Sequence, residues 1–303
     1  MFHHIKIFVS TTLILLLVSC GGKESSTRIP VSTKSTEAET LLHEALKLNS
    51  ISKGDEAKKK LLKAIEVDEN FGFAYIVLST FGTNTVAETD KYYEKAVSLK
   101  NDLNEVEQCM LEVRTSYREN DTEKRMKYSK KILELIPENA FAHLRMAYTY
   151  WEVADIPNSR KYLLSAIGID KYYGEAYSAL IQNYSFDEPK SYDKAEKYAS
   201  DLLSYNKNES YYHVTLGDVY RAQNKLEKAA EKYDDAYKTG TNNYFSAAKA
   251  GHAYTMFNPS EARKKFDQAI NEARNTNQKI GPEYAKVYTY LHEDDFQGAY
   301  TQL

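Results

Sequence analysis

The stretch Ser210–Asn243, SYYHVTLGDVYRAQNKLEKAAEKYDDAYKTGTNN, decides the fold of this chain. Small and apolar residues recur at helical spacing in two parts of it, at Leu216, Gly217 and Tyr220 and then at Ala229, Tyr233 and Ala236. Between the two parts lies the polar turn Gln223-Asn224-Lys225. This pattern predicts two amphipathic helices that pack together across a short turn.

A short or aliphatic residue recurs along the whole chain at nearly constant spacing, at Ala64, Ala96, Ile132, Ala166, Leu202, Ala236 and Ala269. The intervals are 32, 36, 34, 36, 34 and 33 residues. A period near 34 indicates a helical solenoid, in which each unit buries its apolar face only against its neighbours. The 303 residues contain only 12 Gly and 6 Pro, which agrees with a helical chain.

The repeated unit resembles the tetratricopeptide repeat (TPR), a helix-turn-helix of 34 residues with Leu-Gly, Tyr, Ala, an aromatic residue and Ala at fixed offsets. The unit from Ala140 carries the pattern at Met146, Ala147, Tyr150, Ser159, Leu163 and Ala166, and the unit from Tyr244 carries it at Ala250, Gly251, Tyr254, Ala262, Phe266 and Ala269. The resemblance implies an all-α fold, a right-handed α-α superhelix (TPR solenoid) of about seven repeats plus C-terminal capping helices. We expect the solenoid over 37–303, with repeats at 37–70, 71–101, 102–139, 140–173, 174–209, 210–243 and 244–274 and capping helices at 282–303.

The first residues are typical of an export signal. Lys6 precedes an apolar stretch, Ile7–Val18, that is too short to span a bilayer. The following Leu17-Val18-Ser19-Cys20 resembles the lipobox of bacterial lipoproteins, which implies a signal peptide over 1–19 and acyl chains on Cys20. A plain signal peptide or a buried apolar helix is the alternative. Residues 20–36, rich in Gly, Ser and Thr, are expected to form a flexible linker.

Composition and motifs argue against several classes of function. The formal net charge is −3, which gives no basic footprint for nucleic acid. We find no metal-ligand spacing, phosphate loop or nucleophile elbow, so we expect no catalytic residues, no metal, no cofactor and no enzyme activity. His143 and His213, at equivalent repeat positions, are interpreted as packing residues rather than paired ligands, and Cys109 as a small buried hydrophobe.

In the TPR family the first helix of each repeat lines the concave face. Mapped onto this chain, the resemblance implies a partner-binding strip, the groove strip, at Phe141, Leu144, Tyr148, Trp151, Gln182, Tyr211, Asp218, Arg221, Phe245 and His252. Trp, Tyr and Arg dominate interface energetics, which favours a docking surface. The alternative is that these aromatic residues pack against adjacent helices and leave little open groove.

The leading hypothesis is a membrane-anchored adaptor or scaffold lipoprotein of the bacterial cell envelope that binds other envelope proteins or peptides. The lack of Asp after Cys20 resembles lipoproteins sent to an outer membrane, but neither the membrane face nor the oligomeric state follows from the sequence. The alternative is a glycan- or nutrient-binding cell-surface lipoprotein of an uptake system.

Overall fold

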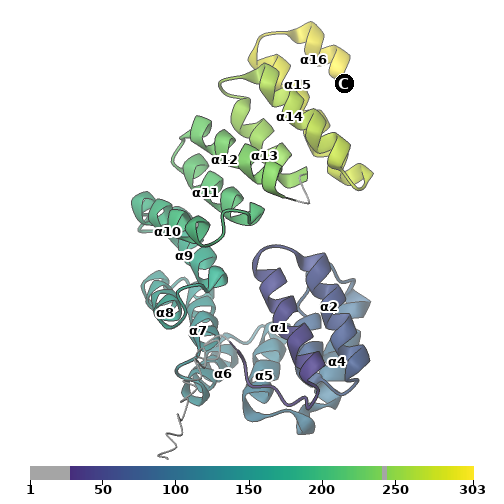
Figure 1. Cartoon of the computed structure of the whole chain (residues 1–303), viewed down its shortest axis with the longest axis vertical. Coiled ribbons are helices and arrows are strands. Elements are labelled where there is room, and N and C mark those ends of the chain that lie inside the picture. The colour runs from purple at the N-terminus through teal and green to yellow at the C-terminus, as the bar shows by residue number, and fades with distance from the viewer. Residues whose placement is uncertain (1–27, 241–243) are drawn as a thin grey trace, which may run out of the picture.

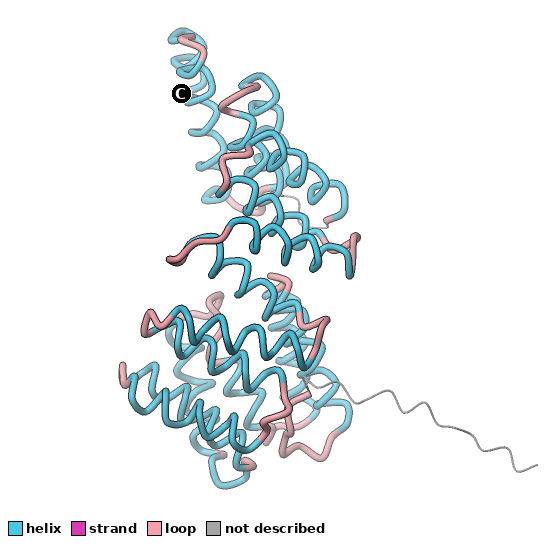
Figure 2. Tube along the Cα trace, turned by 90° about the vertical axis from the view of Figure 1, so that its left-hand side faces the viewer, coloured by secondary structure: helices cyan, strands magenta, loops and turns pink. Residues whose placement is uncertain are grey.

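The described chain is built from α-helices alone, with one short 3₁₀-helix. The computed structural model describes residues 28–240 and 244–303, and these contain no strand (Figure 1; Figure 2). The elements are α1 (Thr36–Ser50), α2 (Gly54–Val67), α3 (Gly72–Leu78), α4 (Val86–Ser98), η1 (Lys100–Asp102), α5 (Glu105–Glu119), α6 (Thr122–Leu135), α7 (Ala140–Glu152), α8 (Ile156–Ile169), α9 (Gly174–Phe186), α10 (Tyr192–Tyr205), α11 (Ser210–Ala222), α12 (Leu226–Thr239), α13 (Tyr244–Tyr254), α14 (Pro259–Glu272), α15 (Thr276–His292) and α16 (Phe296–Gln302). No helix in the described ranges is long and apolar enough to cross a membrane.

Consecutive helices pack as pairs, and the pairs stack in chain order from α1–α2 to α13–α14. The last two helices, α15 and α16, continue the stack at the C-terminal end (Figure 1). The fold is therefore the predicted all-α helical solenoid. The first capping helix begins at Thr276, earlier than the expected Pro282, because Asn275 caps it by accepting the N–H of Gln278.

One turn geometry recurs between the two helices of a pair. Five pairs place a residue other than glycine in the left-handed region at the same point of the turn, at Ser52, Asn120, Ala154, Asn224 and Asp294. The pairs α3–α4, α9–α10 and α13–α14 connect differently, and none of their turns contains a residue in the left-handed region. The spacing of the repeat is thus maintained by a common local turn as well as by packing.

The close approach of the helices explains the Leu-Gly pair of the repeat. A Cβ atom placed on Gly217 of α11 would lie 2.6 Å from the ring of Tyr233 on α12, which is fully buried. The same substitution at Gly251 of α13 would come within 2.5 Å of the buried ring of Phe266 on α14. Glycine is required at both positions because the aromatic ring occupies the space of a side chain.

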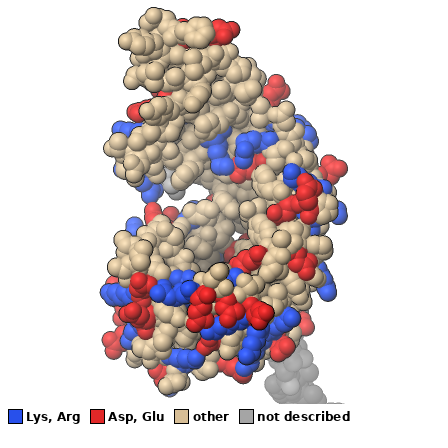
Figure 3. Space-filling model, turned by 180° about the vertical axis from the view of Figure 1, so that it is seen from behind, with Lys and Arg blue, Asp and Glu red and all other residues tan. Residues whose placement is uncertain are grey.

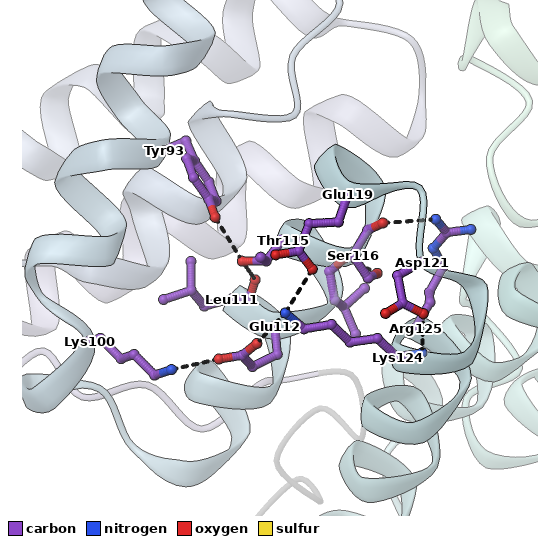
Figure 4. Close-up of polar contacts among 11 residues, drawn as sticks. Tyr93, Lys100, Leu111, Glu112, Thr115, Ser116, Glu119, Asp121, Lys124 and Arg125 are labelled. Atoms are coloured by element: carbon purple, nitrogen blue, oxygen red, sulfur yellow. Dashed lines mark hydrogen bonds and ion pairs between the residues drawn. The ribbon is translucent and has the colours of Figure 1, made fainter.

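A polar network holds the third pair to its surroundings (Figure 4). Glu112 of α5 accepts from Lys100 at 2.6 Å and lies 3.0 Å from Lys124 of α6, which also contacts Glu119 at 3.0 Å. Burial raises the pKa of Glu112, but hydrogen bonds from the two lysines outweigh this and hold it below its usual value. This cluster links η1, α5 and α6 and leaves no uncompensated charge.

The segment that precedes the first helix lies against the solenoid from residue 28 onward. We call residues 28–33 the strap. Ile29 is 1% exposed, and Asn139 and Asn104 donate to the carbonyl groups of Arg28 and Pro30 at 2.9 and 3.0 Å. The expected flexible linker over 20–36 therefore does not extend through its C-terminal half, because apolar burial and these hydrogen bonds fix the strap. Residues 20–27 lie outside the described residues.

The solenoid curves until its first pair faces its later pairs. The turn between α1 and α2 approaches two distant loops: Lys53 lies 3.3 Å from Glu209, just before α11, and Asp55 lies 3.3 Å from Arg274, before α15. Figure 3 shows the molecule hollowed between these parts. The concave surface is therefore partly enclosed by the first pair of helices.

Candidate functional site

The residues of the groove strip belong to the helices α7, α9, α11 and α13, whose arrangement Figure 1 shows. The first residues of the strip are buried in the hydrophobic core, since Leu144 is 1% exposed and Phe141 is 9% exposed. Leu144 is thus a core residue and offers no surface to a partner. For this part of the strip the alternative of helix packing is correct, because the tight curvature turns α7 toward its neighbours.

The middle of the strip forms an aromatic cluster. The rings of Tyr148 and Trp151 stack with centroids 6.3 Å apart, and the hydroxyl of Tyr148 donates to Glu175 at 3.3 Å. Burial raises the pKa of Glu175, and the positive charge of Arg145 opposes that rise. The guanidinium carbon of Arg145 lies 5.8 Å from the ring centroids of both Phe141 and Tyr148. This cluster joins adjacent pairs and borders two hollows.

We call the larger hollow the inner cleft. It has a volume of about 680 Å³ and lies between α1 and α3 on one side and the ends of α7, α9 and α11 on the other. The strap contributes Arg28 and Ile29 to its lining. The smaller hollow, of about 470 Å³, is lined by Tyr117, Arg145, Tyr148, Trp151 and Glu152, so Arg145 borders both hollows. No sequence pattern predicts the inner cleft, because its walls come from helix pairs that are far apart along the chain.

The later part of the strip is open to solvent. Gln182, Arg221 and His252 are exposed, and Phe245 is 56% exposed. We call these four residues the open groove. Tyr211 is half-buried, with its ring 6.3 Å from that of Tyr212.

Asp218 stands beside the open groove but is already engaged. Its carboxylate accepts from the hydroxyl of Tyr233 at 2.7 Å and from Lys249 at 2.6 Å, and Arg221 lies 3.8 Å away. These contacts tie α11 to α12 and α13. Asp218 therefore positions the helices, and Arg221 pairs with it while its side chain stays 49% exposed.

His252 lies against the core at one edge, with its ring 5.1 Å from the ring of Phe266. Burial lowers the pKa of His252, and the positive charges of Arg221 and Lys249 lower it further.

The residues considered for chemistry have structural contacts. The Nε2 atoms of His143 and His213 lie 2.8 Å from the carbonyl oxygens of Pro137 and Lys207, which is the same contact in two repeats. Cys109 is 2% exposed, as predicted for a small buried hydrophobe, and burial raises the pKa of its thiol. Among residues 28–240 and 244–303, no group of three His, Cys, Asp or Glu side chains is placed to hold a metal ion. Cys20 and the signal peptide expected over 1–19 lie outside the described residues.

Comparison with known proteins finds similar folds among solved structures. No protein-family profile and no curated protein matches the chain. Among solved structures, yeast Tom70 is similar over 89% of this chain and 60% of its own, with 16% identity and a TM-score of 0.58. A tetratricopeptide repeat protein from Parabacteroides merdae covers 88% of this chain and 91% of its own at 11% identity and a TM-score of 0.46. MamA covers 53% of this chain and 93% of its own at 22% identity and a TM-score of 0.45.

The likeness to Tom70 concerns the fold alone, and this chain spans 60% of the length of that protein. The succession of helix pairs, the buried small residues and the Gly–aromatic contacts define the class: an all-α helical solenoid of tetratricopeptide type. Stacked repeats of this kind build an extended, curved surface.

Proposed function

We propose that this protein is a non-enzymatic scaffold of the bacterial cell envelope, anchored by acyl chains on Cys20 and binding other envelope proteins or peptides. The observation that carries the proposal is the open groove, where Gln182, Arg221, Phe245 and His252 are exposed on three successive inner helices. Exposed Phe and Arg side chains are among the residue types that are enriched in protein–protein interfaces. The anchor and the outer-membrane location rest on the lipobox resemblance.

Site-directed photocrosslinking tests the groove. A photoreactive phenylalanine analogue at Phe245 is expected to capture a defined protein in the native envelope, and the same analogue at exposed Lys228 on α12 serves as the control. The double variant Arg221→Ala, Phe245→Ala is expected to weaken partner capture at least about tenfold, as for the loss of an interface anchor. Equal capture from both positions, or capture unchanged in the double variant, would show that another face binds.

The anchor is tested separately. Cys20→Ser is expected to abolish incorporation of a labelled fatty acid and to release the mature chain from the membrane fraction, because stable attachment requires more than one acyl chain. Retention of both the label and the membrane association in this variant would refute lipidation at Cys20.

A further inference from the structure

The inner cleft has an apolar floor. Six side chains from the strap, α3, α5 and α7 form it, namely Ile29, Phe73, Ile76, Val77, Met110 and Phe141. Its volume of about 680 Å³ is in the range of small-molecule sites, which are mostly apolar with a few polar groups that fix orientation. The cleft therefore has room for an apolar body larger than a single amino-acid side chain.

The acidic groups of the cleft are already engaged. Each has a partner of its own: Glu44 with Lys60 at 2.7 Å, Asp170 with the backbone N–H of Tyr172 at 2.9 Å, Glu175 with the hydroxyl of Tyr148 at 3.3 Å, and Glu209 with Lys53 at 3.3 Å. Each of these carboxylates therefore already has a partner within the protein, and Lys60 and Lys53 offset the charges of Glu44 and Glu209.

Two side chains of the cleft have buried nitrogen atoms without a hydrogen-bond partner in the described part of the chain. The Nε–H of Arg145 is buried and has no hydrogen-bond partner in the described part of the chain, although a guanidinium can only donate. On the opposite wall, Nε2 of His43 is also buried without a hydrogen bond, and the nearest carboxylate, that of Glu39, is 3.8 Å away. The Arg145 side chain lines the cleft, so a ligand carboxylate that contacts its guanidinium would offset part of the cost of burying a donor without an acceptor.

We propose that the inner cleft binds an amphipathic monocarboxylate, with an unbranched apolar chain on the floor and its carboxylate at Arg145. A carboxylate matches the guanidinium and forms a charge-assisted hydrogen bond with it. This inference goes beyond the scaffold function and does not depend on the open groove.

The probe is dodecanoate, titrated into the purified full chain. Trp151, the only tryptophan of the chain, lies with Arg145 on the wall of the neighbouring hollow and reports binding by its fluorescence. The expected result is a saturable change at one molecule per chain. Dodecanol has the same apolar chain without the charge, and it is expected to bind at least about tenfold more weakly. Equal binding of dodecanol, or no saturable change with dodecanoate, would overturn the proposal.

Substitutions place the carboxylate. Arg145→Met keeps a long side chain but removes the donor, and it is expected to weaken dodecanoate at least about tenfold while leaving dodecanol unchanged. Lys130→Met removes an exposed positive charge on α6, outside the cleft, and is expected to bind like the unmodified chain. Unchanged dodecanoate binding by a folded Arg145→Met would overturn the assignment; should that variant not fold, the comparison of dodecanoate with dodecanol decides. Loss of protein capture by the open-groove variant with dodecanoate binding intact separates this proposal from the scaffold function.

Discussion

Lys53 lies 3.3 Å from Glu209, although 156 residues separate them along the chain. The pair joins the turn between α1 and α2 to the start of α11 across the mouth of the inner cleft, and the side chain of Glu209 is only 11% exposed. In a solenoid, each repeat is stabilised mainly by its neighbours. In this molecule, an additional contact joins the first helix pair to the sixth. This ion pair, together with that of Asp55 and Arg274, links the first helix pair to later parts of the solenoid.

We therefore expect Lys53→Glu to open the solenoid. The substitution replaces an attraction with a repulsion at Glu209, at a cost of about 1 kcal/mol that decreases with added salt. Small-angle scattering is expected to show a larger radius of gyration at low ionic strength, with partial recovery at high salt. Lys130→Glu, on the exposed side of α6, is the control and should leave the radius unchanged. The same radius for all three proteins would show that packing alone sets the curvature.

Two glycines should respond in opposite ways to the same substitution. Gly217→Ala is expected to destabilise the protein by about 1–3 kcal/mol, because the new Cβ meets the immobile ring of Tyr233. Gly168→Ala, in the last turn of α8 with open space around its Cα, is expected to stabilise it by roughly 0.5 kcal/mol through helix propensity. Urea unfolding followed by circular dichroism measures both. A Gly217→Ala protein as stable as the original would contradict the close packing of α11 on α12.

The recurring left-handed turn allows a stabilising change. Ala154 has φ of 57°, where an alanine pays about 1–2 kcal/mol that a glycine avoids, against about 0.5–1 kcal/mol of extra chain entropy for glycine. Ala154→Gly is therefore expected to raise the free energy of unfolding by a few tenths of a kcal/mol to about 1 kcal/mol. The same change at Asn224, a residue that tolerates this conformation, should gain less. Destabilisation at Ala154 would show that the turn is held by contacts of its methyl group.

Two capping-box glutamates should have opposite pH dependence. Glu107 of α5 is fully buried, and burial raises its pKa even though the N–H groups of Ser32 and Asn104 donate to it. Glu88 of α4 accepts from the N–H of Thr85 and from Lys58, and these hydrogen bonds lower its pKa. A raised carboxyl pKa means that the folded state binds the proton more tightly, so the contribution of Glu107 to stability grows as the pH falls from 7 toward 4.5. The contribution of Glu88 is present above pH 4.5 and is lost as the pH falls below it.

The measurement is the free energy of unfolding from pH 3.5 to 7 for the original chain, Glu107→Gln and Glu88→Gln. The difference between the original and Glu107→Gln should increase toward low pH, and the difference for Glu88→Gln should decrease. Parallel curves for the two variants would mean that Glu107 is solvated in the folded protein.

The fold could be predicted from the sequence because the residues that specify it lie close together along the chain. Gly217, Tyr233 and Ala236 lie within one repeat, and their spacing alone predicts the contact that the structure contains. The groove was predicted less well. Whether Leu144 points into solvent depends on how far the solenoid curves, and that curvature is set by contacts such as Lys53 with Glu209, which no repeat pattern contains. The inner cleft was missed for the same reason, since His43 and Arg145 come from the first and fourth pairs.

The strap affects how far the chain can be shortened at its N-terminus without loss of stability. Asn104 and Asn139 each cap a helix with the side-chain oxygen while the amide nitrogen holds a strap carbonyl, and Glu107 accepts the N–H of Ser32 at 2.9 Å. A protein trimmed to begin at Thr36, where the first repeat starts, would leave a void in place of Ile29 and remove one partner of a fully buried carboxylate. We therefore expect a chain that begins at residue 28 to be more stable than one that begins at Thr36, although the periodic sequence starts only there.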